Sequence, residues 1–541
     1  MPINYSQKKV LIVDDFADFR RTVRGIVQQL GVLEIDQAGT AEEALKLCKE
    51  QHYDVILSDY NLGEGKDGQQ FLEELKFVGR LRNQDVFLMI TAENTSAMVM
   101  GALDYMPDGY LTKPFNKAML QNRLDKIVEK KEALADIEQA MDKRQYERAL
   151  DGCKTLIGAN SPHALAALRL QAECLEKLNR LDEAADVYRN VLENRPLPWA
   201  MLGLGKLHFR KGEYEPAKAL FEEITRVNPM FLNAFDWLAK TLAAQGEAKR
   251  AQQTLESAVK VSPKTILRQM NLGELARGNE DVDAAVRAYR SAIRLGKNSC
   301  YNTPDNYLHF SQSVRQKLAR DGASQCKALI DDSQRALQEA AETYKERKDV
   351  AFRVELQRAS LSQALGKEAD ANAALSKAEA LYGAVEQQLS GEAMVEFAGV
   401  LKDAGQNERA QELLKAAASK FGDNESVMRA ARALLDDQSA IQQGEEAQEL
   451  NVQGVRLFEQ GEPRKALACF LKARELNPDN VSINLNTAQA IVYLCNGGQG
   501  EPAMLKIGKR CLSQIGELPE DDKRHARFQE LVRLINQMIG E

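Results

Sequence analysis

The first quarter of the chain alternates short strand-like runs with segments whose apolar residues recur at helical spacing. The strand-like runs are residues 10–13, 32–38, 55–57, 86–90 and 109–112. One helical segment begins at Thr40 with Glu43 three residues later, the pattern of a capping box, and another is expected over 69–81. Short apolar runs separated by helices predict a parallel sheet covered on both faces. We therefore expect an α/β, doubly wound, five-stranded domain.

The remainder of the chain repeats instead of alternating. Alanine recurs at Ala184, Ala217, Ala251 and Ala285, with spacings of 33, 34 and 34 residues, and a large residue follows each by four positions, at Tyr188, Phe221, Leu255 and Tyr289. Small residues let two helices approach closely, and stacked helix pairs bury what one pair cannot. This pattern resembles the tetratricopeptide repeat of about 34 residues. We expect an all-α solenoid whose first helices lie near 165–176, 198–210, 230–243 and 264–276.

The predicted boundaries follow these patterns. We expect a sheet domain at 1–125, a helical connector at 126–134, repeats at 135–296, an irregular helical segment at 297–350 and further repeats at 351–541. The irregular segment is either a hinge, a few atypical helices or a set of degenerate repeats. Neither Gly nor Pro interrupts residues 115–151, so the last helix of the sheet domain either continues into the first repeat or breaks near 129–132. The polar stretch 438–448 predicts a short linker.

Composition excludes several classes of function. The chain has 541 residues, of which 44% are hydrophobic, and a formal net charge of −7. This balance argues against a nucleic-acid partner held by bulk charge, and no apolar run reaches the length of about 18 residues that would span a membrane. The start lacks the apolar core of a signal peptide, and eight scattered cysteines without a Cys-x-x-Cys pair are typical of buried, reduced thiols. We expect a cytoplasmic protein without membrane insertion.

Polar residues that could bind a ligand or take part in a reaction lie where the predicted strands end. Asp14, Asp15, Asp59, Thr91 and Lys113 each lie at or just after the end of a strand-like run. The carboxyl ends of parallel strands share one edge of the sheet, where such folds bind ligands. Three carboxylates brought together repel one another, and a hard cation such as Mg²⁺ would neutralise them. The cation, the lysine and the threonine could then receive a phosphoryl group carried by an aspartate.

These motifs resemble the receiver domain of two-component response regulators. The matching segments are Val13-Asp14-Asp15, Leu57-Ser58-Asp59, Ile90-Thr91-Ala92 and Leu111-Thr112-Lys113-Pro114-Phe115. The resemblance implies that Asp59 is the phosphoacceptor and that Asp15, Asp59 and the backbone carbonyl of Asn61 hold Mg²⁺, with Asp14 assisting through water. It also implies that Thr91 and Lys113 bind the phosphoryl oxygens.

The resemblance carries further expectations. Tyr110 is the expected switch aromatic, the Lys113-Pro114 bond is expected to be cis, and a sensor histidine kinase is the expected phosphodonor. Asn61 and Glu93 flank the expected path of the attacking water and predict a short-lived phosphoryl group. Gly63 departs from the proline that the family usually has there, which leaves the shape of this loop open.

The favoured hypothesis is a response regulator whose output is protein–protein interaction through its repeats. The alternatives are a regulator acting in trans on a catalytic partner, such as another regulator or a kinase, and a structural scaffold that does not depend on phosphorylation. No enzymatic activity is expected apart from phosphoryl transfer to its own aspartate. Lys206, Arg210 and Lys240 lie on predicted first helices and are candidates to bind an extended acidic segment of an unidentified partner protein.

Overall fold

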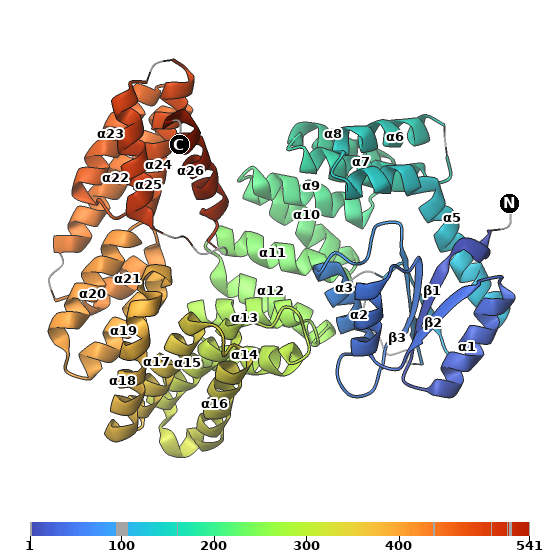
Figure 1. Ribbon diagram of the computed structural model, residues 1–541, viewed down its shortest axis with the longest axis horizontal. Helices are drawn as coiled ribbons and strands as arrows, with labels where there is room; N and C mark the ends of the chain where they lie inside the picture. The colour runs from blue at the N-terminus through green and yellow to red at the C-terminus, as the bar shows by residue number, and fades with distance from the viewer. Residues whose placement is uncertain are drawn as a thin grey trace. The chain divides into compact units, whose positions relative to one another are not determined.

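The computed structural model describes residues 3–92, 107–159, 161–436, 439–498, 500–516, 518 and 522–539. The chain divides into two compact units, Met1–Ser313 and Val314–Glu541. The first unit contains a sheet domain followed by paired helices, and the second consists of helices (Figure 1). The boundary between the units lies inside the irregular helical segment that the sequence predicts.

The sheet is parallel and has five strands in the order β2-β1-β3-β4-β5. The strands are β1 (Lys9–Val13), β2 (Glu34–Ala38), β3 (Val55–Asp59), β4 (Val86–Thr91) and β5 (Gly109–Thr112). All five match predicted strands, so the predicted fold class is confirmed. The order changes direction at β1 and β3, and in an open parallel sheet this is where a ligand site is expected at the carboxyl ends of the strands.

Helices cover both faces of the sheet (Figure 1). They are α1 (Ala17–Gln29), α2 (Ala41–Glu50), α3 (Gly68–Phe77) and α5 (Lys117–Asp142), and a short 3-10 helix, η1 (Tyr5–Gln7), precedes β1. Leu11 and Ile56 pack in one core with residues of α2 and α3, whereas Val10 and Val55 pack in a second core with residues of α1 and α5. Alternate strand residues point to opposite faces, and burial on both faces explains why β1 and β4 are almost entirely apolar, whereas the edge strand β2 is mostly polar and only partly buried.

Helix α3 ends at Phe77, four residues before the predicted end at Leu81. Gly79 adopts a positive φ of 65°, and the backbone N–H of Arg80 donates to the carbonyl of Leu75 at 2.9 Å. This is the six-to-one hydrogen bond of a Schellman motif, which closes a helix at a residue in the left-handed region. The apolar periodicity continues past that glycine, which is why the sequence pattern places the end too late.

The helix that begins after Thr40 has most of the predicted capping box. The Thr40 hydroxyl accepts a hydrogen bond from the Glu43 N–H at 3.2 Å, while the Glu43 carboxylate accepts from the N–H of Gly39 at 2.7 Å. The carboxylate thus reaches one residue further back than in the usual motif. A complete capping box, which the sequence reading did not identify, starts α3, where Asp67 and Gln70 satisfy each other's backbone N–H groups.

Paired helices fill the rest of the first unit. They are α6 (Tyr146–Gly158), α7 (Ala164–Lys177), α8 (Leu181–Asn194), α9 (Pro198–Arg210), α10 (Tyr214–Val227), α11 (Leu232–Ala244), α12 (Ala248–Val261), α13 (Ile266–Gly278) and α14 (Val282–Gly296). Helices α7, α9, α11 and α13 match the predicted first helices within two residues at each end. The four anchor alanines are completely buried. The repeat is therefore a packing unit, in which each anchor alanine is enclosed by its neighbours.

Glycines on first helices face a large residue of a neighbouring second helix, which for Gly203 is the preceding helix α8 and for Gly205 is the following helix α10. A Cβ atom added at Gly205 would lie 2.5 Å from the Phe221 ring, and one added at Gly203 would lie 2.2 Å from Tyr188. The same arrangement occurs in the second unit, where Gly454 faces Phe470 at 2.5 Å. These distances are shorter than any carbon–carbon contact allows, so the glycines set how closely the paired helices approach.

Helix α5 runs without a break from Lys117 to Asp142. It therefore continues through 129–132, where the sequence left a break open. Leu120 and Leu124 pack in the core of the sheet domain, while Leu134 and Ile137 pack in the core of the first repeats. One rigid helix thus contributes to both hydrophobic cores.

The second unit also consists of helices, and α15 (Pro304–Asp321) crosses the boundary between the units. The others are α16 (Ala323–Thr343), α17 (Lys348–Ala364), α18 (Glu368–Val385), η2 (Glu386–Gln388), α19 (Gly391–Asp403), α20 (Asn407–Lys420), α21 (Glu425–Leu434), α22 (Ser439–Glu459), α23 (Pro463–Leu476), α24 (Val481–Asn496), α25 (Pro502–Ile515) and α26 (His525–Ile539). The predicted linker at 438–448 is wrong, because α22 includes most of it. Polar residues there lie on an exposed helix surface, which composition alone does not separate from a loop.

Two further findings bear on the sequence predictions. All eight cysteines are free, although Cys300, Cys469 and Cys495 are only partly buried. Among the described residues, no helix combines the length and the apolar character that crossing a membrane requires.

The glycine contacts predict a specific loss of stability. In Gly205→Ala, the new Cβ would displace the Phe221 ring, and overpacking of this kind costs about 1–3 kcal/mol. The matched control is Gly383→Ala, because Gly383 lies inside α18 with no neighbouring atom within 4 Å of its added Cβ. That variant should gain up to about 1 kcal/mol from helix propensity. Urea unfolding followed by far-ultraviolet circular dichroism measures both; equal stability of the two variants would contradict the packing account.

Candidate functional site

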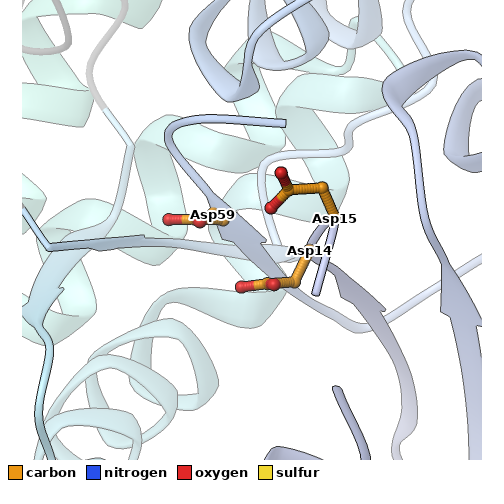
Figure 2. A group of neighbouring side chains, drawn as sticks. All are labelled: Asp14, Asp15 and Asp59. Atoms are coloured by element: carbon orange, nitrogen blue, oxygen red, sulfur yellow. The ribbon is translucent and has the colours of Figure 1, made fainter. Parts of the chain in front are cut away.

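Three carboxylates lie together at the carboxyl edge of the sheet (Figure 2). Asp14 follows β1, Asp15 is the next residue and Asp59 is the last residue of β3. One ligand oxygen from each lies within 4.8 Å of the others. Asp14 and Asp59 are buried and Asp15 is exposed, so the cluster has a closed inner side and an open outer side. Figure 2 shows the three side chains turned to the same side.

Lys113 supplies the positive charge of the cluster. Its ammonium nitrogen lies 2.7 Å from Oδ2 of Asp14 and 2.9 Å from Oδ2 of Asp59. It also lies 4.0 Å from the centroid of the Phe19 ring, a cation–π contact that helps to hold the side chain in place. One ammonium balances only one of the three carboxylates. The site therefore retains a net negative charge and suits a divalent cation.

Burial and the positive charge of Lys113 act in opposite directions on the pKa of Asp59. Burial raises the pKa of its carboxyl, the hydrogen bond and the charge of Lys113 lower it, and the negative charge of Asp14 raises it again. The backbone N–H of Tyr60 also donates to Oδ1 of Asp59 at 2.9 Å. The result is a pKa above the ordinary value, as expected for a desolvated carboxylate beside a like charge. Such a carboxylate gains from any cation or electrophile that relieves the charge.

The other predicted residues that the structure describes lie on β4, on β5 and in the loop after β3. Thr91 is the buried last residue of β4, and its carbonyl accepts a hydrogen bond from the Lys113 N–H at 2.8 Å. Tyr110 is half-buried and packs against the core shared with α2 and α3. Asn61 is exposed two residues after Asp59. The Lys113-Pro114 bond is cis, as expected, and Glu93 lies outside the described residues.

The loop after β3 explains the departure at Gly63. Gly63 and Gly65 have φ values of 77° and 99°, in the left-handed region that glycine enters without strain. Proline is fixed near −65° and could not adopt this conformation. An added Cβ at Gly63 would lie 3.5 Å from an Asp15 carboxylate oxygen, so this loop closes over the acidic cluster with a path of its own.

The cationic candidates of the repeats lie on α9 and α11. The Lys206 ammonium lies 5.2 Å from the centroid of Trp237, and the Lys240 ammonium lies 4.6 Å from it. Burial lowers the pKa of Lys206, and the positive charge of Arg169 lowers it further, while Glu176 and Glu173 raise it. Two cations thus lie close to one aromatic ring.

Arg210 and Arg268 already have acidic partners. Arg210 lies 3.6 Å from Glu176. Arg268, another cation on a predicted first helix, is buried and donates from Nε and Nη2 to the two carboxylate oxygens of Asp236, each at 2.8 Å. Its guanidinium therefore forms an internal ion pair between adjacent first helices and does not face a partner.

Trp237, which lies next to both lysines, was not among the candidate residues of the sequence analysis. Phe209 completes this surface, with its ring centroid 5.5 Å from that of Trp237 and 5.2 Å from the Lys240 ammonium. The sequence does contain a signal for this surface. Lys206 and Lys240 are separated by one repeat and so occupy equivalent positions on neighbouring first helices, and Trp237 precedes Lys240 by three residues and so lies on the same side of its helix. Phe19, beneath Lys113, has no comparable local signal.

Two family models match the chain. The response regulator receiver domain model covers residues 10–125, and the tetratricopeptide repeat model covers residues 137–197, 202–265, 238–300 and 451–491. Chemotaxis protein CheY-3 of Vibrio cholerae serotype O1 is 35% identical over 122 residues, which are 23% of this chain and 92% of that protein. Chemotaxis protein CheY of Pseudomonas aeruginosa is 31% identical over 122 residues and is covered to 97%.

Two solved structures are also similar to parts of the chain. Chemotaxis response regulator CheY4 of Vibrio cholerae is 29% identical with a TM-score of 0.21, covering 22% of this chain and 98% of that one. The C-terminal part of a TPR repeat-containing protein from Cytophaga hutchinsonii is 15% identical with a TM-score of 0.37, covering 46% and 95%. On its match to nearly complete receiver proteins, and with repeats following, the chain belongs to the response regulator family and joins a receiver domain to tetratricopeptide repeats.

Proposed function

We propose that this protein is a phosphorylation-controlled response regulator of a two-component system whose output is protein–protein interaction through its repeats. The observation that carries the proposal is the Lys113 ammonium shared between Asp14 and Asp59 at the strand ends. A further support is that five polar residues lie at or just after strand ends on one edge of the sheet. They are Asp14, Asp15, Asp59, Thr91 and Lys113. We place this activity in the cytoplasm, with a sensor histidine kinase as phosphodonor.

Asp59 is the proposed phosphoacceptor. One of its carboxylate oxygens attacks the phosphorus of the donor; a P–O bond forms as the donor's P–N or P–O bond breaks, and the electron pair leaves with the donor group. Lys113, now within hydrogen-bonding distance of Asp59, would bind an oxygen of the transferred group. The Thr91 hydroxyl, at the end of the neighbouring strand, would donate to another.

The acidic cluster fits the Mg²⁺ of this family. Asp15, Asp59 and the backbone carbonyl of Asn61 would hold the ion, and Asp14 would assist through water. The fit rests on the net negative charge of three carboxylates beside a single ammonium, and on oxygen donors, which Mg²⁺ prefers. When bound, the ion supplies charge neutralisation to the phosphoryl oxygens.

The output surface is proposed to lie on the first helices of the repeats. Lys206 and Lys240 over Trp237, with Arg210 nearby, would bind a carboxylate of an extended partner segment. The two ammonium groups lie near one aromatic ring, so an acidic side chain placed beside this ring would meet positive charge in a partly desolvated place. Tyr110 is the proposed switch residue of the receiver. The modules proposed for these roles are the receiver 1–125, the connector 126–134 and the repeats 135–296 and 351–541.

The phosphoacceptor is tested by labelling. With Mg²⁺ and acetyl phosphate, intact mass spectrometry should show one acid-labile phosphoryl group on the wild type and none on Asp59→Asn. Lys113→Ala should lose most of the labelling, because it removes a charge from a site that gains roughly two negative ones. EDTA should abolish labelling of the wild type.

Asp18→Asn is the matched control, since Asp18 is an exposed carboxylate on α1 and should be labelled like the wild type. Asp59→Asn should remain at least as stable as the wild type, because the raised pKa of Asp59 means that its ionised form is disfavoured in the folded protein. Equal labelling of wild type and Asp59→Asn would refute the assignment.

The repeat surface is tested with a defined probe, a fluorescein-labelled peptide of ten glutamates. Replacing Lys206, Arg210 and Lys240 together by alanine should weaken its binding by about tenfold or more at low salt, where charge attraction is strongest. The control replaces Lys154, Lys249 and Lys260, which are exposed on the second helices α6 and α12. Fluorescence anisotropy measures both. If the two triple variants lose the same affinity, the peptide responds only to overall charge and the assignment of this surface fails.

A further inference from the structure

The receiver and the end of α14 touch at a site far from their covalent connection. Asn298 donates from Nδ2 to the carbonyl of Gly65 at 2.8 Å, and Gln70 donates from Nε2 to the carbonyl of Leu295 at 3.3 Å. These pairs are 233 and 225 residues apart in the chain, and both lie within the first compact unit. The contact therefore closes a ring through α5 and the repeats.

Aromatic and charged groups extend this contact on both sides. The rings of Phe77, at the end of α3, and Tyr301 meet edge to face with centroids 5.6 Å apart. At the other end, the Lys264 ammonium lies 5.8 Å from the centroid of Tyr60. Lys264 also acts on Asp67, whose pKa is raised by burial and lowered by that positive charge. The contact thus runs from the residue after the phosphoacceptor to the last residue of α3.

The receiver side of the contact is tied to Asp59 by short backbone links. The Tyr60 N–H donates to Oδ1 of Asp59 and to the carbonyl of Ile90, at 2.9 and 2.8 Å. The Gly68 N–H donates to the Tyr60 carbonyl at 2.8 Å, and a Cβ at Gly68 would lie only 2.1 Å from the Asp59 carbonyl oxygen. The start of α3 is therefore packed directly against the phosphoacceptor backbone.

Gln70 connects the start of α3 to the repeats. Its side-chain oxygen accepts from the Asp67 N–H at 3.1 Å as part of the capping box, while its amide nitrogen donates to Leu295. A shift of the loop before α3 would move the cap and this amide together. The same loop carries the Gly65 carbonyl that Asn298 binds, so both hydrogen bonds depend on the loop conformation.

We propose that residues 295–301 form a latch on the receiver loop 60–68 and α3, closed in the unphosphorylated chain and loosened by phosphoryl transfer to Asp59. The inference rests on the proposed function of that aspartate. A phosphoryl group adds roughly two negative charges beside the loop. Gly63 and Gly65, both at positive φ, give the loop the backbone freedom to rearrange.

The named contacts of the latch are individually weak. They are two hydrogen bonds and the Phe77–Tyr301 ring pair, with the distant Lys264 cation beside them, so modest differential binding is enough to shift them. Linkage is reciprocal: if phosphorylation loosens the latch, breaking the latch must favour phosphorylation by the same factor. This gives two independent measurements, one on the repeats and one on the aspartate.

The first measurement is hydrogen exchange by mass spectrometry on the full chain, with and without Mg²⁺ and acetyl phosphate. Exchange in residues 65–77 and 295–302 should become faster on phosphorylation of the wild type and stay constant in Asp59→Asn. Unchanged or slower exchange in a chain that is labelled at Asp59 overturns the latch and leaves the proposed function standing. Failure of Asp59 to take up label overturns both.

The second measurement uses the double variant Asn298→Ala with Tyr301→Ala. At limiting acetyl phosphate, its ratio of phosphorylated to unphosphorylated chain should exceed that of the wild type by a factor on the order of five. Lys249→Ala is the control, because Lys249 is exposed on α12, outside the latch, and should match the wild type. Equal ratios in all three proteins overturn the latch, as does a ratio that rises equally in the control.

Discussion

The repulsion among three carboxylates at one edge of a parallel sheet is the constraint on which the receiver depends. The sheet order places Asp14 and Asp59 on neighbouring strands, and Lys113 reaches both from the end of β5. One ammonium leaves negative charge unbalanced, and burial of Asp59 makes that imbalance costly. The unbalanced charge suits a cation, and the proposed phosphoryl transfer to Asp59 would change the charge that the neighbouring groups meet.

Two structural routes lead from this site to the repeats. Helix α5 contributes Leu124 to the receiver core and Ile137 to the repeat core, so it joins the two without a flexible segment. The loop after β3 makes the second connection through Gly65 and Asn298. A rigid connection and a weak contact together constrain the receiver against its repeats, and the weak contact is the one that a change of charge can open.

The local sequence pattern was sufficient to predict the strands, the repeat helices and the gathering of the polar residues at one edge of the sheet. Strand ends in a parallel sheet meet by geometry, so the positions of Asp14 and Asp59 relative to Lys113 follow once the strands are identified. Helix ends were harder to predict from the sequence, since the glycine at residue 79 terminates α3 through a hydrogen bond between backbone groups. The pairing of side chains from different helices was the hardest feature to predict. Asp236 and Arg268 lie about one repeat apart, yet only packing decides whether such a pair closes inward or faces a partner.

The central claim is that the charge on Asp59 controls what the repeats bind. Its most direct test is the affinity of the full chain for the glutamate peptide, measured before and after stoichiometric phosphorylation with acetyl phosphate and Mg²⁺. The account predicts two affinities that differ by a factor of about five or more, the usual range of coupling between sites, and a single affinity for Asp59→Asn under both conditions. Equal affinities in the phosphorylated and unphosphorylated wild type would contradict it.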